Sequence, residues 1–326
     1  LVARYLLMNV TPTVAVFGIG LFFVIDVRTR LYSRAILTES LAVLLTTVLT
    51  LALLKVIRTR RCRDAALLGI LGGLSMLNRT AFVLWLPILT IGLLWPTRRA
   101  AVGTATPTPT MTAPDASTTQ STLQHRLTLA AVMLLVTIAV YAPWAIRNVM
   151  VLGRFMPTGT QGLMELPTAF SDRAYEHRGV WVSNPDDFFS EVDRPGQSRL
   201  QQEVARAEYS RRVATEWIAA HPFRAAVLGP LKVFQEYRPR LFSEWIIGLL
   251  SLLGIARTWK SDATKVFLWL HLCTAFQLAC TWSVEGRFLV PLMFSLHVWA
   301  AQAFPKRSRV TPVSEGGPTQ LPRETG

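Results

Sequence analysis

Residues 67–87 read LLGILGGLSMLNRTAFVLWLP, an apolar stretch that Asn78 and Arg79 interrupt near its middle. A single membrane span here would place an unpaired arginine at mid-bilayer, which is costly. A surface turn between two shorter helices avoids that cost, so the sequence predicts a helical hairpin. The glycines Gly69, Gly72 and Gly73 lack the preceding strand and the Lys-Ser/Thr pair of a phosphate-binding loop. They favour close packing of the first helix against a neighbouring helix.

The composition around this hairpin is that of a membrane protein with several crossings. Of the 326 residues, 51% are hydrophobic and 17% are charged, and the mean hydropathy is +0.34. The net charge of +14 comes mostly from short basic clusters beside apolar blocks, which indicates membrane topology and lipid contact rather than nucleic-acid binding. The three cysteines form no disulfide framework, and the five histidines have no metal-ligand spacing. His271 and His297 fall within apolar segments, where a hydrogen-bonded packing role is expected.

Apolar segments that could cross a bilayer lie at about 6–25, 38–57, 64–78, 80–95, 128–146, 241–257, 265–284 and 288–304. With the hairpin counted as two crossings, four basic clusters fall on one face. They are Lys55, Arg58, Arg60, Arg61 and Arg63; Arg98 and Arg99; Arg257, Lys260 and Lys265; and Lys306, Arg307 and Arg309. The positive-inside rule makes this face cytoplasmic. We therefore expect a multi-pass protein of the cytoplasmic (inner) membrane.

The spans and polar blocks define four predicted regions. These are transmembrane helices over 1–147, with a disordered Thr/Pro-rich cytoplasmic linker at about 100–124; an extracytoplasmic region over 148–240; three transmembrane helices over 241–304; and a disordered cytoplasmic tail over 305–326. Within the extracytoplasmic region, an amphipathic helix is expected to stop near His221-Pro222. A second helix should follow and lie along the membrane surface.

Basic residues also occur at the predicted outer face, where topology does not explain them. In PWAIRNVMVLGRFMP (143–157), Pro143 and Trp144 are expected to end a helix at the outer interface, and Arg147 and Asn148 follow at once. Each such residue alone suits an interfacial anchor, because an arginine near a helix C-terminus complements the helix dipole. Glu39, near a helix start, would do the same with opposite sign, helped by a Thr38 or Ser40 cap.

Taken together, the charged residues predicted at this outer face indicate a binding site for an anion. They are Arg79 in the hairpin turn; Arg147 with Asn148; Glu285 and Arg287 in WSVEGRFLVP; Glu39 in AILTES; and Asp26. A cluster of arginines requires an anion, and the anion natural to a membrane edge is a lipid phosphate or pyrophosphate. The carboxylates beside them could act as a general base, ligate a divalent cation or pair with the arginines.

Four stretches resemble, in order, the polyprenyl-phosphate-sugar-dependent glycosyltransferases of the GT-C fold, relatives of protein O-mannosyltransferases and lipid A aminoarabinose transferases. YAPWAIRNVMVLGRFMPTGTQG is similar to the family's Pro-Trp-x-x-Arg-Asn segment. YSRAILTESLAVLL is similar to its acidic helix start, LLGILGGLSMLNRTAFVLWLP to its Gly-rich helix before Leu-x-Arg, and EGRFLVPLMFSLHVWAAQAF to its Arg-aromatic-x-x-Pro helix. The resemblance covers residues 32–304. It implies an all-α, GT-C-like bundle of transmembrane helices with a small, mainly helical extracytoplasmic region.

The resemblance also implies a reaction. A sugar would pass from undecaprenyl- or dolichyl-phosphate to a hydroxyl of a lipid, glycan or protein acceptor, with inversion, on the extracytoplasmic side. Residue by residue, it assigns the donor phosphate to Arg79, Arg147, Asn148 and Arg287, with Glu285 and Trp144 in support. Glu39 matches an acidic position whose role is structural or catalytic. A carboxylate-held Mg²⁺ or Mn²⁺ is the one cofactor that this chemistry leaves open.

One departure from the family concerns the catalytic base. The family carries that acid in a long first outer loop, whereas here Asp26 and Glu39 follow the first apolar segment within a short stretch. We expect either that the chain begins after this loop or that the protein is inactive. Two other functions stay open. A transporter or flippase of a lipid-linked substrate predicts internal repeats and mid-membrane charges, and a non-catalytic relative would bind lipid phosphate alone.

Overall fold

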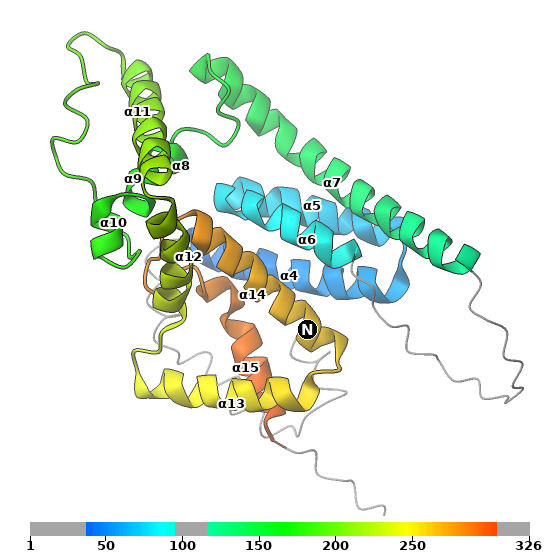
Figure 1. The fold of residues 1–326 in the computed structure, drawn as a ribbon. Coiled ribbons are helices and arrows are strands. Elements are labelled where there is room, and N and C mark those ends of the chain that lie inside the picture. The colour runs from blue at the N-terminus through cyan, green and yellow to red at the C-terminus, as the bar shows by residue number, and fades with distance from the viewer. Residues whose placement is uncertain (1–36, 95–115, 305–326) are drawn as a thin grey trace, which may run out of the picture.

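A computed structural model describes residues 37–94 and 116–304, and these are mainly helical (Figure 1). The elements are α4 (Leu37–Thr59), α5 (Cys62–Asn78), the 3₁₀ helix η1 (Thr80–Leu84), α6 (Trp85–Leu94), α7 (Ala116–Leu152), α8 (Gln161–Met164), α9 (Leu166–Ala169), α10 (Asp172–Glu176), α11 (Arg199–Ala220), α12 (Pro222–Tyr237), α13 (Phe242–Thr258), α14 (Asp262–Cys280), the 3₁₀ helix η2 (Val290–Leu292) and α15 (Met293–Gln302). Within the two described ranges there is no strand, only an isolated bridge between Val180 and Ser283. The prediction of an all-α protein is confirmed.

Three of these helices are long and apolar enough to cross a membrane: Glu39–Thr59, Leu123–Leu152 and Asp262–Cys280. A fourth crossing is added if α12 and α13, which meet at an angle of 108°, form one broken span. The remaining predicted spans with described residues form the shorter helices α5, η1–α6 and η2–α15. The predicted span at 6–25 lies outside the described residues. The described part of the chain is therefore all-α, with three to four helices that could span a membrane.

The predicted hairpin at residues 67–87 is present. Helix α5 ends at Asn78, and Arg79 takes an extended conformation (φ −147°, ψ 114°) before η1 and α6. The glycines of α5 face α7: a Cβ added to Gly69 would lie 2.6 Å from the Met133 carbonyl oxygen, and one on Gly73 would lie 2.6 Å from Val140 Cβ. Because a side chain at either glycine would collide with α7, the prediction of close helix packing is confirmed.

Helix α7 differs from its prediction at both ends. Its backbone is helical from Ala116, so the last part of the predicted disordered linker, 116–124, belongs to the helix. That part contains no proline, in contrast to the preceding Pro-rich residues, so it can extend the apolar helix backwards. At the other end, α7 continues through Pro143 to Leu152 (Figure 1). The prediction that Pro143 and Trp144 end the helix is wrong, because one missing backbone donor does not stop a well-packed helix.

This longer helix also changes the interpretation of Arg147. The last turn of α7 contains no basic residue, and Arg147 precedes the end of the helix at Leu152 by more than a turn. The helix dipole acts mainly within the last turn. The interpretation of Arg147 as a cap for the dipole is therefore wrong.

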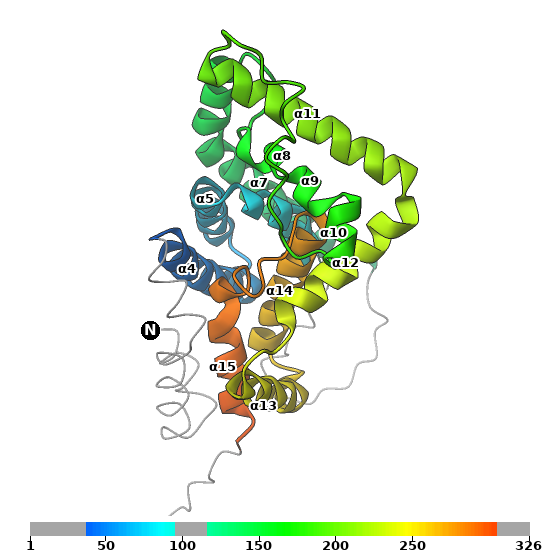
Figure 2. The ribbon, with the colours of Figure 1, turned by 90° about the vertical axis from the view of Figure 1, so that its left-hand side faces the viewer.

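The polar region between α7 and α12 is built on α11 (Figure 2). Its first turn carries a capping box, in which the Ser198 hydroxyl accepts from the Gln201 N–H and the Gln201 side chain accepts from the Ser198 N–H. The helix ends at Ala220, and Pro222 begins α12, as the sequence predicted. In Figure 1, α8 to α11 lie beside one end of the helical bundle.

A bidentate ion pair ties the loop before α11 to this helix and predicts an acid-sensitive contact. Arg206 donates from Nε and Nη2 to Asp193, at 2.8 and 2.5 Å. These bonds lower the pKa of the Asp193 carboxyl below its ordinary value and raise the pKa of Arg206. Since the folded pKa of Asp193 is the lower one, its stabilisation is complete above about pH 4 and is lost as the pH falls further.

We therefore expect Asp193→Asn to lower the unfolding midpoint at pH 7 and to lower it by a smaller amount at pH 3. The measurement is the wild-type-minus-variant difference in midpoint at the two pH values. Asp186→Asn, at an exposed aspartate of the same loop, is the control and should show a small difference at both. An Asp193→Asn effect of the same size at pH 7 and pH 3 would contradict the assignment.

The core that supports the bundle lies among α4, α5, α6, α7 and α14. Its fully buried members include Leu49, Leu68, Leu93, Leu129 and Leu270. Helix α4 packs against η2, and Glu39 in the first turn of α4 bonds to Arg287 in the loop just before η2. Three elements consequently converge: the first turn of α4, the hairpin turn after α5, and the loop before η2.

Candidate functional site

A buried carboxylate joins the three converging elements. Glu39, in the first turn of α4, is fully buried. Its Oε1 accepts from Nε of Arg287 at 2.5 Å and lies 3.5 Å from Nη2 of Arg79. The three residues are far apart in the sequence, so only the tertiary fold brings them together. Three of the predicted site residues thus form one cluster.

The geometry of this cluster favours the structural role for Glu39. Both guanidinium groups act on the same carboxylate oxygen, so Glu39 orients two cations that would otherwise repel each other. The guanidinium of Arg79 also lies over the Phe288 ring, 5.2 Å from its centroid. The side chains of Arg79 and Arg287 keep 16% and 27% of their surface exposed, so each can still meet a ligand from outside.

The loop that carries Arg287 is held by a residue that the sequence analysis missed. Glu236, near the end of α12, is fully buried. Its Oε2 accepts from the Ser283 hydroxyl at 2.8 Å and the Val284 N–H at 3.1 Å, and its Oε1 accepts from the Phe288 N–H at 2.5 Å and the Leu289 N–H at 3.3 Å. In the sequence Glu236 lies in an amphipathic stretch among other polar residues, so no local signal marks it as buried.

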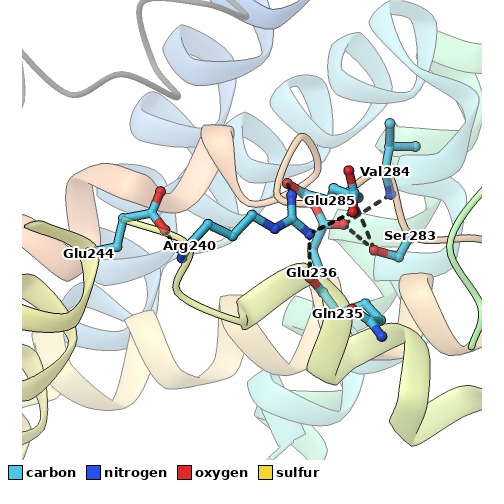
Figure 3. Close-up of polar contacts among 7 residues, drawn as sticks. All are labelled: Gln235, Glu236, Arg240, Glu244, Ser283, Val284 and Glu285. Atoms are coloured by element: carbon cyan, nitrogen blue, oxygen red, sulfur yellow. Dashed lines mark hydrogen bonds and ion pairs between the residues drawn. The ribbon is translucent and has the colours of Figure 1, made fainter. Parts of the chain in front are cut away.

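A second contact, from the segment between α12 and α13, reaches the same loop, and Figure 3 shows the two together. Arg240 donates from Nη1 to the Glu285 carbonyl oxygen at 2.6 Å and from Nη2 to the Gln235 carbonyl oxygen at 3.2 Å, and it pairs with the Glu285 carboxylate at 3.2 Å. The Arg240 N–H donates to Glu244 at 2.6 Å. Glu285, predicted as a supporting residue, therefore pairs with Arg240 rather than with the arginines on Glu39.

The remaining predicted phosphate ligands form a separate group on α7. The exposed Arg147 guanidinium lies over the Trp144 ring, 5.0 Å from its centroid, and donates to Asn148 Oδ1 at 3.1 Å. The buried Asn148 in turn donates to the Pro157 carbonyl oxygen at 3.1 Å, which ties the next loop to the helix. Among the side chains described over 39–94 and 123–304, no carboxylate lies within ion-pair distance of Arg147.

The packing of α5 against α7 shows where the cluster around Glu39 lies relative to Arg147 and Asn148. Gly69 faces Met133 and Gly73 faces Val140, so the two helices run in the same direction. Arg79, just after α5, and Arg147, near the end of α7, therefore lie toward the same end of this helix pair. The fold brings Arg79 and Arg287 into direct contact with Glu39, and it leaves Arg147 and Asn148 in a second group at this end. Asp26 lies outside the described residues.

Two further features bear on ligands. An apolar cavity of about 400 Å³ is lined by α13, α14, α15 and the end of α12, including Pro239 and Glu244 beside Arg240. In the parts of the chain that the structure describes, no group of three or more His, Cys, Asp or Glu residues could hold a metal ion. The described residues therefore provide no ligand set for the Mg²⁺ or Mn²⁺ that the expected chemistry leaves open.

The histidines of the apolar helices have the packing role that the sequence predicted. His271 bonds through Nδ1 to the Tyr237 hydroxyl at 2.7 Å and through Nε2 to the Ser295 hydroxyl at 2.8 Å. Since the Ser295 hydroxyl donates to the Leu292 carbonyl oxygen, the chain is satisfied if the Tyr237 hydroxyl donates to Nδ1 and His271 donates from Nε2. His297 bonds through Nδ1 to the Met293 carbonyl oxygen at 2.8 Å. The bonds of His271 tie the end of α12 to α14 and α15.

No protein family model matches the chain, and no curated protein or solved structure matches it.

Proposed function

We propose that this protein is a membrane glycosyltransferase that moves a sugar from a polyprenyl-phosphate donor to a hydroxyl acceptor on the extracytoplasmic side. The observation that carries the proposal is the convergence of Arg79 and Arg287 on the buried Glu39. Arginine is suited to phosphate because its planar fork donates two parallel hydrogen bonds. Two such forks, held side by side by one carboxylate, suit a ligand with several phosphate oxygens.

In the proposed reaction, the bond between the sugar carbon and the phosphate oxygen breaks while the acceptor oxygen bonds to that carbon from the opposite face. Negative charge develops on the departing phosphate, and fixed cations stabilise it most in the transition state. Arg79 and Arg287 supply such cations from the exposed edges of their side chains. The exposed Arg147, without a carboxylate partner in the described chain, is the third candidate.

The acceptor proton must pass to a base, and the described carboxylates near the site are already engaged. Glu39 holds two guanidinium groups, Glu236 accepts four hydrogen bonds, and Glu285 pairs with Arg240. Each of these carboxylates would have to release one of its present donors before it could take up the acceptor proton. We therefore assign the base to a residue outside the described ranges, with Asp26 as the candidate in this chain.

The same arrangement supports the proposed donor lipid and the proposed side of the membrane. Pro239 and Glu244, which line the apolar cavity of about 400 Å³, flank Arg240, so the cavity can take apolar chain next to a charged group. Glu39 lies at the opposite end of α4 from the basic cluster around Lys55 and Arg58. If that cluster is cytoplasmic, the arginine site faces the extracytoplasmic side of the cytoplasmic membrane.

The test is transfer of labelled sugar from a polyprenyl-phosphate donor by the protein in lipid nanodiscs. We expect Arg147→Ala to lower transfer by about tenfold or more, since a lost charge-assisted bond to a phosphate costs about 1.5–3 kcal/mol. Arg154→Ala is the matched control: it removes another exposed arginine close in sequence, which pairs with Glu208. Its transfer rate should stay within about twofold of the wild type. Equal rates for the wild type and Arg147→Ala would remove Arg147 from the mechanism.

A second function, lipid-phosphate binding without transfer, is favoured by the same engagement of the described carboxylates. It predicts that the protein binds polyprenyl phosphate, that Arg287→Ala weakens this binding, and that no sugar moves from any donor offered. Measurement of binding beside transfer separates the two functions. A protein that neither binds polyprenyl phosphate nor transfers sugar contradicts both.

A further inference from the structure

We propose that Glu236 is a positioning residue that sets the place of Arg287 for its contact with the phosphate; this role rests on the function proposed above. Arg287 lies in the segment from Ser283 to Leu289, which has no regular secondary structure of its own. Such a segment needs external partners for its backbone groups, and a mobile arginine there would lose affinity for any ligand. The carboxylate of Glu236 provides these partners.

The contacts of Glu236 enclose Arg287 on both sides along the chain. Oε2 holds Ser283 and Val284 before it, and Oε1 holds the backbone N–H groups of Phe288 and Leu289 after it. All four groups are donors, so the acceptor must present two oxygens, as only a carboxylate does. A glutamine would turn its own NH₂ group toward two of these donors. An isosteric amide is therefore a severe change at this position.

The turn between these anchors is strained, which explains why it needs so many bonds. Glu285 has a φ of 53° and Gly286 a φ of 102°, both in the left-handed region. For a residue with a side chain such as Glu285 this conformation is uncommon and must be stabilised by its surroundings. Arg240 adds to that stabilisation through its bond to the Glu285 carbonyl oxygen at 2.6 Å.

The helix end that carries Glu236 is itself fixed. The neighbouring Tyr237 bonds to His271 of α14 at 2.7 Å. One turn earlier, the buried Lys232 ammonium lies 3.8 Å from the centroid of the Phe170 ring and 3.5 Å from the Ala279 carbonyl oxygen. Because these contacts fix the end of α12, Glu236 holds the loop of Arg287 in a constant place relative to the helix.

The same loop is also paired with the polar region. Ser283 donates its N–H to the Gly179 carbonyl oxygen at 3.1 Å and accepts from the Trp181 N–H at 2.8 Å. Glu236 therefore holds the loop at the point where it meets the segment after α10. A shift of that segment would pull on Ser283 and so displace Arg287. The bond from Ser283 to Glu236 resists this displacement.

The experiment compares Glu236→Gln and Glu236→Asp with the wild type in nanodiscs, with two readouts. One is hydrogen–deuterium exchange of residues 283–289; the other is the affinity for polyprenyl phosphate. For Glu236→Gln we expect faster exchange and an affinity lower by about tenfold or more, because small displacements of a binding group are costly. Glu236→Asp, which keeps the carboxylate on a side chain one methylene shorter, should recover part of both. Ser283→Ala, which removes one of the four donors, should give a smaller change of the same kind.

Asp64→Asn is the matched control. Asp64, in the first turn of α5, is also a buried carboxylate, paired with Lys55 at 3.0 Å and accepting from Thr59 at 2.6 Å. It lies beside the other end of α4 from Glu39. The Asp64→Asn variant should be less stable, but its hydrogen–deuterium exchange at 283–289 and its affinity for polyprenyl phosphate should match those of the wild type. If Glu236→Gln or Ser283→Ala lowers stability while exchange and affinity match those of Asp64→Asn, Glu236 is merely structural and the proposal is overturned.

The two readouts separate this proposal from the function on which it rests. Faster exchange at 283–289 in Glu236→Gln, in a protein whose wild type binds no polyprenyl phosphate, supports the positioning role and contradicts the proposed function. If Glu236→Gln leaves exchange at 283–289 unchanged while the wild type binds polyprenyl phosphate, the positioning role is contradicted and the proposed function is supported.

Discussion

Replacing Glu39 by leucine is expected to destabilise the folded protein by about 3 kcal/mol or more, because it leaves two guanidinium groups facing each other without their shared anion. Glu39 is fully buried, and its contacts to Arg287 and Arg79 are 2.5 and 3.5 Å. Both arginines retain partial exposure, which places the expected cost at the lower end of the range for a broken buried ion pair. The measurement is denaturant unfolding in mixed micelles.

A double-mutant cycle separates the charge effect from the loss of packing. In Glu39→Leu combined with Arg287→Met, one uncompensated charge is removed, so the combined cost should be smaller than the sum of the two single costs by about 1–3 kcal/mol. Phosphate-lipid affinity should fall in all three variants, since Glu39 holds the arginines in place. Additive costs, or a Glu39→Leu variant as stable as the wild type, would show that the cluster does not act as a unit.

Gly254→Ala is expected to destabilise the protein by about 3 kcal/mol, through the contact of α13 with α15. A Cβ on Gly254 would lie 1.8 Å from the Trp299 carbonyl oxygen and 3.1 Å from its Cα, and both are backbone atoms that no rotamer change can move. The helices would have to separate, and Trp299, which is nearly fully buried and packs on Phe267, would lose contacts. The same micelle unfolding assay measures the effect.

Gly248→Ala on the same helix is the matched control. A Cβ there meets no atom within 4 Å. Alanine is the better helix former, so this variant should be unchanged or more stable by about 0.5–1 kcal/mol. Equal effects at the two glycines would refute the close approach of α13 and α15.

Much of the local structure could be predicted because it depends on neighbours in the sequence. Asn78 and Arg79 break an apolar run, so a turn was expected and is present. The histidine and proline at 221–222 separate α11 from α12, since proline disfavours the continuation of a helix and suits its first position. Pro143 shows the limit of this reasoning. The same residue type lies inside α7, where packing on α5 maintains the helix.

The candidate site could be predicted only in part. The charge of Arg79, Glu39 and Arg287 at helix ends was visible in the sequence, and the fold joins them in one cluster. Their pairing was not visible, because no spacing rule relates residues so far apart. Glu236 was missed for a different reason: within its amphipathic stretch it resembles an exposed glutamate, and only the loop that folds over it makes it a buried acceptor.

The sequence by itself thus determined most of the long helices, the breaks at Arg79 and at Pro222, the glycine-lined face of α5 and the presence of unexplained arginines near helix ends. Each follows from local hydrophobicity, backbone preference or side-chain size. Only the tertiary structure decided which carboxylate those arginines share, that Arg147 belongs to a second group, and that Glu236 holds the loop of Arg287. These outcomes depend on contacts among helices that close long loops, and the free energy of such contacts comes from burial and pairing that the local sequence does not encode.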